Sequence, residues 1–374
     1  MPNVSRFLFC IHNHLEIVLF DKPSVFCRKV SQQTIYICRK NPQAPVQPLL
    51  SFAPFRGITH KAYRNAFARH IGGIDTYYAP FISGTGTAQV HPAKLEDLIP
   101  ISQQAAPTIP QVISNNAGEM ILLGNILADR GYTELNWNLG CPFARIANKK
   151  RGCGLIPYPE IVDSILAEAV PKLHPALSVK TRLGYRHPGE IRKLLEVLNQ
   201  YPIKKIIIHT RTGKQVYSGK ADPAAFADCL KLSAHPLVYN GDIIHVPQLT
   251  FLQSVFPEQR EWMVGRGLLI NPFLALEIKG TVLTPAEKRD RLKAFHEEIW
   301  QAARERIGHE TRRIGWMKAI WHYMSGMFSA RDEVFFHIKR SKTDKEYLKA
   351  AEHGIQQNFA DETELEAHFL KLTK

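Results

Sequence analysis

The stretch ELNWNLG (134–140) is followed by PEIVDSILAEAV (159–170) and then by LSVKTRL (177–183). The outer two segments are short and have the composition of strands. In the middle segment, apolar residues recur at three- and four-residue steps after a proline, which predicts an amphipathic helix. A strand, a helix and a second strand in this order predict one unit of a parallel sheet.

The same alternation extends over residues 48–283. Further strands are predicted at LLSFAPF (49–55), DTYYAPF (75–81), TIPQVIS (108–114), KKIIIHT (204–210), PLVYNGD (236–242) and EWMVGRG (261–267). Helical patterns lie between them at 60–70, 119–131, 189–200, 223–232 and 246–256. Eight strands alternating with helices over about 235 residues predict an α/β fold, the (β/α)8 TIM barrel. A doubly wound sheet is the alternative, but FAPFRGIT (52–59) follows the first strand where that fold usually has GxGxxG.

Two regions flank this predicted barrel domain. Residues 284–374 are predicted as a second, all-helical domain with patterns at 285–306 and 312–328. It ends in a predicted acidic tail, because residues 346–374 hold three basic and six acidic side chains. Residues 1–47 lack glycine and any sustained period, so we predict an irregular N-terminal extension. This extension contains three of the six cysteines, Cys10, Cys27 and Cys38.

The composition is that of a globular protein, since 45% of the 374 residues are hydrophobic and 22% are charged. The six cysteines are too few for a disulfide scaffold and lack zinc-ribbon spacing, so we expect a reducing, cytoplasmic location and no bound metal. The sequence has no run of 18 apolar residues, so we predict no membrane span. The formal charge is +14, and residues 145–220 hold 15 basic and 5 acidic side chains. An acidic partner is therefore expected, with an ordinary solvated surface as the alternative.

Polar residues or glycines occur at the C-terminal ends of seven of the eight predicted strands, where the loops of a TIM barrel gather around a shared site. One such residue on a strand is usually a satisfied core group, but this repetition predicts a functional site. The residues are Pro54, Arg56, Gln111, Asn138, Cys141, Lys180, Arg182, His209, Arg211, Asn240, Asp242, Gly265 and Arg266.

The last two strands end in motifs suited to a phosphate. In VGRG (264–267) we expect Gly265 and Gly267 to let the backbone approach a ligand and Arg266 to bind a phosphate. YNGDI (239–243) offers a similar glycine. Because TIM barrels commonly bind phosphate in these loops, a phosphorylated cofactor is expected, with glycines that only punctuate turns as the alternative.

Three strand-end residues suggest the chemistry. Lys180 and His209 would face the same mouth, where a flavin reduced to its anion needs a cation or a donor. Cys141 lies in a loop with glycine and proline and could donate a proton to a carbanion-like centre, although a single cysteine is often only packed. Cys153 is the rival thiol. Nearby basic residues would hold an anionic substrate: Arg145, Lys149, Lys150 and Arg151.

These motifs resemble those of the tRNA-dihydrouridine synthase family over about residues 48–340, and among bacterial members they are closest to the DusC-like subgroup. NxGCP and HTRTxxQxYSG, in this order, are specific together, whereas VGRG also occurs in other FMN barrels. The resemblance is carried by APFRGIT (53–59), NLGCP (138–142), GCGLI (152–156), VKTRLG (179–184), HTRTGKQVYSG (209–219), NGD (240–242), VGRG (264–267) and RRIGWMKAIWHYM (312–324).

The resemblance implies an enzyme that reduces the C5–C6 double bond of a specific D-loop uridine in tRNA to 5,6-dihydrouridine. NADPH would reduce a bound FMN, flavin N5 would give hydride to C6, and Cys141 would protonate C5. Asn138 would position the base and Arg182 and Arg211 would orient it, with Lys180 and His209 completing the catalytic set. The resemblance implies that FMN is lined by Pro54, Phe55, Arg56, Gln111, Lys180, His209, Asn240, Gly241, Asp242, Gly265 and Arg266.

The family resemblance also implies tRNA as the partner, and we expect a monomer with neither a membrane nor a protein partner. The four basic residues near Cys141 would bind tRNA together with Arg312, Arg313, Lys318, Lys339 and Arg340. Phe55 and Asn136 stand where the family usually has Met and Asp, and Asp242 is an acidic alternative seen among relatives. We therefore expect Phe55 and Arg56 to contact FMN through backbone atoms only.

Two other classes of protein remain open. An FMN barrel that acts on a small pyrimidine, such as a dihydroorotate-type dehydrogenase, would explain VGRG and Lys180 but not the basic segment or the helical domain. A tRNA-binding protein without catalysis would explain the charge, but it predicts the loss of Cys141, Lys180 and His209, which are all present.

Overall fold

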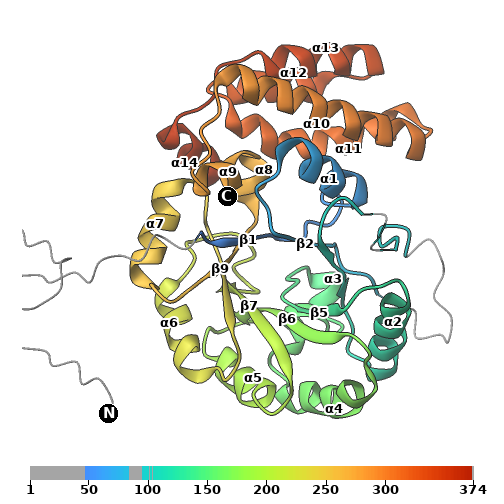
Figure 1. Cartoon of the computed structure of the whole chain (residues 1–374), viewed down its shortest axis with the longest axis vertical. Coiled ribbons are helices and arrows are strands. Elements are labelled where there is room, and N and C mark those ends of the chain that lie inside the picture. Colours follow the sequence, from blue (N-terminus) through green and yellow to red (C-terminus); the bar gives the residue numbers. More distant parts are fainter. Residues whose placement is uncertain (1–46, 84–94, 101, 103, 373–374) are drawn as a thin grey trace, which may run out of the picture. The chain divides into compact units, whose positions relative to one another are not determined.

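A computed structural model describes residues 47–83, 95–100, 102 and 104–372. Its strands form one parallel sheet in the order β3-β2-β1-β9-β8-β7-β6-β5-β4, and β1 pairs with β9 (Figure 1). Residues 1–46 of the predicted extension, which include Cys10, Cys27 and Cys38, lie outside the described residues. The strands are β1 (Leu49–Phe52), β2 (Thr76–Tyr78), β3 (Thr108–Ile109), β4 (Gln111–Val112), β5 (Glu134–Leu139), β6 (Ala176–Gly184), β7 (Ile203–Thr212), β8 (Leu237–Asn240) and β9 (Glu261–Val264).

Strands β3 and β4 are two halves of the third predicted strand, separated by Pro110. Proline has no backbone N–H and interrupts the ladder. Thr108 before it pairs with Tyr77 of β2, and Gln111 after it pairs with Asn136 of β5. The nine elements therefore make a closed barrel of eight strands, which confirms the predicted fold class.

Helices cover the outside of the barrel (Figure 1). In α5 the buried residues Ile191, Leu194, Leu195 and Leu198 fall at the three- and four-residue steps of one helix face. The barrel helices are α1 (Lys61–Ala66, continued by the π-turn Phe67–Ile71), α2 (Ala117–Asp129), α4 (Pro159–Ala169), α5 (Glu190–Leu198), α6 (Pro223–Leu232) and α7 (Val246–Val255). Short helices that the sequence did not predict are α3 (Ala144–Ala147), α8 (Arg266–Ile270), α9 (Leu274–Ile278) and the 3-10 turns Gly152–Leu155 and Val170–Lys172.

Residues after 284 are helical, as predicted, and the predicted acidic tail is part of this helical region. The tail residues form most of α13 and all of α14, and several of their acidic residues cap helices. Thr343 with Glu346 and Asp361 with Glu364 each form a capping box, which satisfies free N–H groups at a helix start. The helices are α10 (Pro285–Arg306), α11 (Glu310–Met324), α12 (Arg331–Arg340), α13 (Asp344–Ile355) and α14 (Glu362–Lys371), with a 3-10 turn at Ser325–Met327. No helix among the described residues is long and apolar enough to cross a membrane.

The helical domain packs on the first βα unit of the barrel. Phe295 of α10 meets Tyr63 and Phe67 edge-on, with ring centres 5.3 and 5.9 Å apart. Trp316 of α11 lies 4.3 Å from the His60 ring and donates a hydrogen bond to the Gly57 carbonyl at 2.8 Å. Aromatic contacts of this kind bury large apolar areas, so the two domains share one packed interface.

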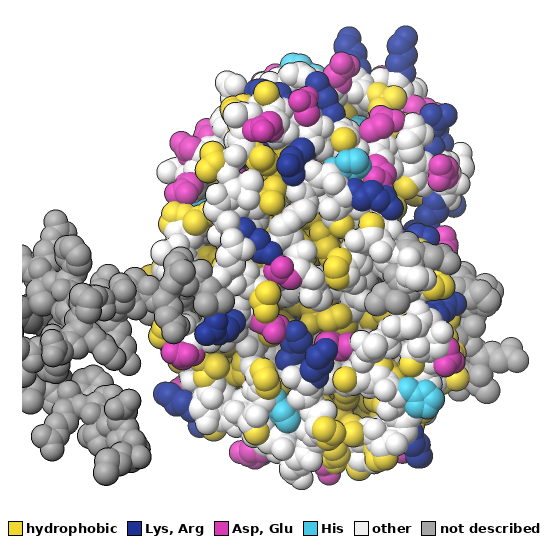
Figure 2. All heavy atoms as spheres, viewed as in Figure 1, with side chains coloured by type: hydrophobic (Ala, Val, Ile, Leu, Met, Phe, Trp, Pro, Cys, Tyr) yellow, Lys and Arg dark blue, Asp and Glu magenta, His cyan; other side chains and the backbone are white. Residues whose placement is uncertain are grey.

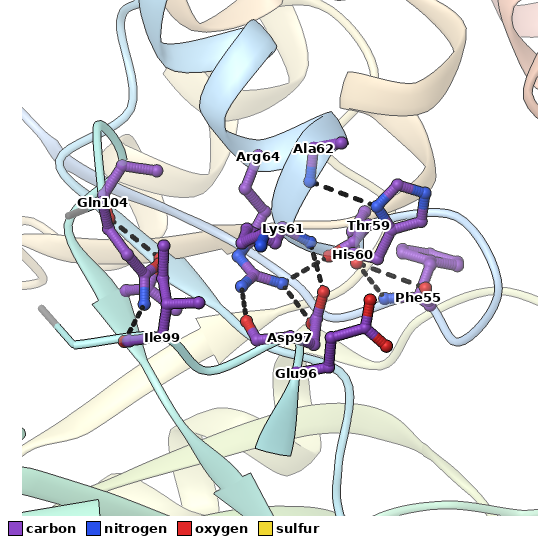
Figure 3. A network of polar contacts seen from close by, with 12 residues as sticks. Phe55, Thr59, His60, Lys61, Ala62, Arg64, Glu96, Asp97, Ile99 and Gln104 are labelled. Carbon is purple, nitrogen blue, oxygen red and sulfur yellow. Dashed lines mark hydrogen bonds and ion pairs between the residues drawn. The ribbon is translucent and has the colours of Figure 1, made fainter. Parts of the chain in front are cut away.

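A buried ion pair holds the turn after β1 (Figure 3). The Arg64 side chain is 1% exposed and donates to the Asp97 carboxylate at 2.9 Å and to the carbonyls of Thr59 and Asp97. Asp97 also accepts from the backbone N–H of Lys61. Thr59 in turn accepts from the backbone N–H of Phe55 at 2.8 Å. The network thus ties the β2–β3 connection to the turn that ends at the mouth of the barrel.

Candidate functional site

One cavity opens at the C-terminal ends of the strands. All eleven residues predicted to line FMN also line this cavity: Pro54, Phe55, Arg56, Gln111, Lys180, His209, Asn240, Gly241, Asp242, Gly265 and Arg266. Five of the six predicted catalytic residues line it as well, namely Cys141, Asn138, Lys180, His209 and Arg182. Seven separate strand ends therefore converge on one space, as the barrel predicts.

Arg211 does not line the cavity, which contradicts its predicted contact with a base. Its side chain is 1% exposed, and its guanidinium is fully occupied by the protein. It binds both oxygens of Asp242 at 2.7 and 2.6 Å and the carbonyls of Ser218 and Gly219. Arg211 therefore fixes the 213–219 loop and Asp242 from behind the cavity wall.

Cys141 is held by a chain of side-chain amides across the barrel floor. The Asn138 Oδ1 atom accepts from the backbone N–H groups of Gly140 and Cys141 at 3.0 and 2.9 Å, which fixes the loop as an Asx turn. Asn138 Nδ2 donates to Gln111 at 2.6 Å, and Gln111 donates to Asn136 at 2.8 Å. Asn136 ends the chain by donating to Ser178. The Asn136 side chain therefore serves as a link in this support.

The thiol of Cys141 stays protonated at neutral pH. Burial raises its pKa, while the backbone N–H of Phe143 and the charge of Arg182 offset part of the effect. Cys153, the rival thiol, is fully buried, does not line the cavity, and has its pKa raised by burial to about 12. Of the two, only Cys141 can meet a ligand as a neutral proton donor.

The cavity wall is cationic. Lys180 Nζ donates to Asn240 at 2.9 Å, and burial lowers the pKa of Lys180 to about 7. Burial first, and then the charges of Arg182 and Lys180, holds the pKa of His209 well below its usual value, so its imidazole is neutral. Arg182 donates to the carbonyls of Gly140 and Thr212 at 2.9 and 2.8 Å. The only carboxylate among the described lining residues is Asp242. This balance favours an anionic ligand.

Arg266 is the lining residue best suited to a phosphate. It is 6% exposed, its Nη2 donates to Asp242 at 3.2 Å, and its Nη1 is buried without a hydrogen-bond partner among the described residues. A buried guanidinium donor left unsatisfied costs about 1–3 kcal/mol, which an anion would relieve. The residues present therefore fit a phosphorylated cofactor.

Two glycines of these loops also serve the protein's own packing, which the sequence did not predict. A Cβ on Gly267 would lie 2.1 Å from the Ile243 carbonyl oxygen, and one on Gly241 would lie 2.7 Å from Thr210 Oγ1. Both clashes are with the chain itself, so these positions require glycine whether or not a ligand binds. A Cβ on Gly265 would make only ordinary van der Waals contact with the Phe55 ring.

Sequence reasoning identified Phe55 but missed other aromatic residues of the cavity. Tyr217 from the β7–α6 connection, Tyr323 from α11 and Phe369 from α14 all line it. Tyr217 and Tyr323 lie inside the quoted motifs HTRTGKQVYSG and RRIGWMKAIWHYM, which was the available signal. Nothing local marked Phe369, because a helix that ends more than 100 residues after the last strand gives no sign of where it docks.

Three of the nine residues predicted to bind tRNA are tied to the protein. Arg151 binds Glu119 and Asn115, Arg313 binds Asp344, and Lys318 donates to the Ser341 carbonyl at 2.6 Å. On the face drawn in Figure 2, basic and acidic side chains are mixed over the helical domain. The predicted residues that are exposed are Arg145, Lys149, Lys150, Arg312, Lys339 and Arg340.

The sequence predicted no metal site. Among the described residues, Glu333, His337 and His353 bring ligand atoms within 4.8 Å of one another on α12 and α13. All three side chains are exposed and none lines the cavity, so we assign no metal to them.

A family model described as dihydrouridine synthase (Dus) matches residues 51–372. The chain is 26% identical over 309 residues to a probable tRNA-dihydrouridine synthase of Aquifex aeolicus, covering 81% of this chain and 94% of that protein. It is 27% identical over 275 residues to a tRNA-dihydrouridine(16) synthase of Pseudomonas syringae pv. tomato, covering 68% and 82% of the two chains. The old yellow enzyme from Trypanosoma cruzi superposes with a TM-score of 0.45 at 7% identity, covering 63% of this chain and 91% of that structure.

Proposed function

The chain belongs to the dihydrouridine synthase family, and from that premise we propose that it reduces a D-loop uridine of tRNA to 5,6-dihydrouridine with FMN and NADPH. The observation that carries the proposal is the convergence of a protonated thiol, Cys141, with Lys180, Arg182 and His209 in one cationic cavity. Reduction of a polarised C=C bond requires a hydride donor and an acid, and a site for a redox cofactor beside a protonated thiol would supply both.

Arg266 would hold the FMN phosphate, and Lys180 and His209 would contact the ring. When bound, FMN supplies the hydride that adds to C6 of the uracil ring. A neighbouring anion raises the pKa of Lys180 from about 7, so the ammonium form is favoured beside the cofactor. His209 stays neutral and can donate or accept a hydrogen bond without adding charge.

Cys141 would give its proton to C5 of the uracil ring. The raised pKa keeps the thiol loaded with that proton at neutral pH. Asn138 holds the backbone of the Cys141 loop, which fixes where the thiol lies, and the same amide borders the space for the base. Arg182 would orient the uracil carbonyls, since its guanidinium borders the cavity beside Gly140.

The target uridine must leave its stack to reach this cavity, as substrates of other base-modifying enzymes do. Arg145, Lys149 and Lys150, all exposed on the Cys141 side of the mouth, would bind the tRNA backbone, and Arg312, Lys339 and Arg340 would do so from the helical domain. Phosphate contacts of this kind lose affinity steeply with salt.

A flavin barrel acting on a small pyrimidine is the second candidate, and it is favoured only by the cavity itself. The test uses purified protein, photoreduced without oxygen and mixed with tRNA that lacks dihydrouridine, while flavin absorbance reports reoxidation. We expect rapid reoxidation by tRNA and a loss of at least about 100-fold in Cys141→Ala. If tRNA leaves the flavin reduced while orotate or free uracil reoxidises it, the tRNA assignment is wrong.

A further inference from the structure

The Arg266 guanidinium lies over two aromatic rings. Its Cζ atom is 4.7 Å from the centre of the Tyr217 ring and 4.3 Å from the centre of the Phe369 ring. Tyr217 belongs to the β7–α6 connection, whereas Phe369 belongs to α14, the last helix among the described residues. Cation–π contacts stabilise a guanidinium most when the pair is shielded from water, and Arg266 is 6% exposed.

The Arg266 guanidinium also forms an ion pair with Asp242, whose side chain is 14% exposed. Its hydrogen bond to Asp242 is 3.2 Å long, while the same carboxylate binds Arg211 at 2.6 and 2.7 Å. Asp242 is therefore oriented mainly by Arg211, and one long hydrogen bond does little to fix a flexible arginine. The two rings therefore add a second constraint on where this guanidinium lies.

Helix α14 is itself firmly docked. Phe369 is 4% exposed and packs with Ile244, Ile270 and Leu365. His368 Nδ1 contacts the Gly326 carbonyl at 2.7 Å, and Lys371 pairs with Asp332 at 3.0 Å. The ring of Phe369 is thus fixed against α8, the helix that begins with Arg266.

We propose that α14 is part of the cofactor site, where Phe369 and Tyr217 pre-orient Arg266 for the phosphate of FMN. The proposal rests on the FMN assignment above and adds that the helical domain contributes a positioning residue to it. Since Arg266 would contact only the phosphate, removal of the Phe369 ring should weaken the binding of FMN. The binding of riboflavin, which lacks the phosphate, should be unaffected. A ring that merely stabilised the fold would affect both flavins alike.

The test measures the dissociation constants of FMN and riboflavin for the flavin-free full chain, from the quenching of flavin fluorescence. Phe369→Leu keeps an apolar side chain but removes the aromatic face, and Tyr217→Leu does the same from the other side. We expect each to weaken FMN about threefold to tenfold with riboflavin within twofold of wild type. Phe251→Leu on α7, where the side chain is 61% exposed, is the matched control and should change neither constant.

Leu365→Ala separates the ring from the docking of its helix, because it loosens α14 without removing the aromatic face. An FMN loss in Leu365→Ala equal to that in Phe369→Leu, or equal losses for the two flavins, would overturn the proposal. Normal FMN binding by Phe369→Leu and Tyr217→Leu would also overturn it and leave the FMN assignment standing. If the wild type binds neither flavin, the cofactor assignment itself fails.

Discussion

Replacement of Asn138 by Ala tests whether the amide chain supports the Cys141 loop. The substitution removes three hydrogen bonds of 3.0, 2.9 and 2.6 Å at a side chain that is 7% exposed. At about 0.5–1.5 kcal/mol net for each bond, the free energy of unfolding should fall by roughly 2–4 kcal/mol. Ser178→Ala is the matched control, because it removes a single bond of 2.9 Å at the far end of the same chain and should cost about 1 kcal/mol.

The measurement is urea unfolding followed by tryptophan fluorescence. Trp137 lies between Asn136 and Asn138 on β5, is fully buried and donates to the Ser114 carbonyl, so it contributes a signal from this part of the barrel. The urea midpoint should shift while the slope m stays constant, since the same surface is exposed on unfolding. A loss below about 1 kcal/mol in Asn138→Ala, or one no larger than in Ser178→Ala, would refute the reasoning.

Three further predictions follow from the charges and the thiol. The proton-donating step should slow as pH rises through the raised pKa of Cys141, because the thiolate has no proton to give; stopped-flow reoxidation should lose this limb in Cys141→Ala. Arg64→Met should lower the free energy of unfolding by about 3–5 kcal/mol, because the Asp97 carboxylate loses its cationic partner beside a buried turn. A urea-unfolding midpoint equal to that of wild type would contradict this. Arg312→Ala should weaken tRNA binding and reduce the slope of log binding constant against log salt concentration by about one. Arg340→Lys keeps the charge and should leave this slope unchanged, and filter binding at several salt concentrations measures both.

Most of the barrel could be predicted from the sequence because its signal is local. Each strand and six of the barrel helices carry their own periodicity, so the eight strands and these six helices were found at their observed places. Pro110 divided one strand in two without changing the count. The elements that escaped prediction, such as Ala144–Ala147, are shorter than one clear helical period.

Only those residues of the site that lie at the C-terminal ends of strands could be predicted from the sequence. The rule that loops gather at one end of a barrel brought Cys141, Lys180 and His209 together correctly. It could not tell that the Arg211 side chain turns behind the wall, because that depends on Asp242 and on the carbonyls of a neighbouring loop. It also could not tell that Gly267, which lines the cavity, is required by the close approach of the Ile243 carbonyl.

The position of Phe369 in the cavity wall affects how the protein is made. The eighth strand ends at Val264, yet the cavity also needs Tyr323 and Phe369, the latter about 100 residues further along the chain. At translation rates of about 5–20 residues per second, the ribosome takes roughly 5–20 s to synthesise that interval. Until α14 has docked, the mouth of the barrel lacks the part of its wall to which Phe369 belongs. Full retention of the proposed cofactor is therefore expected only once α14 has been synthesised and has docked against α8.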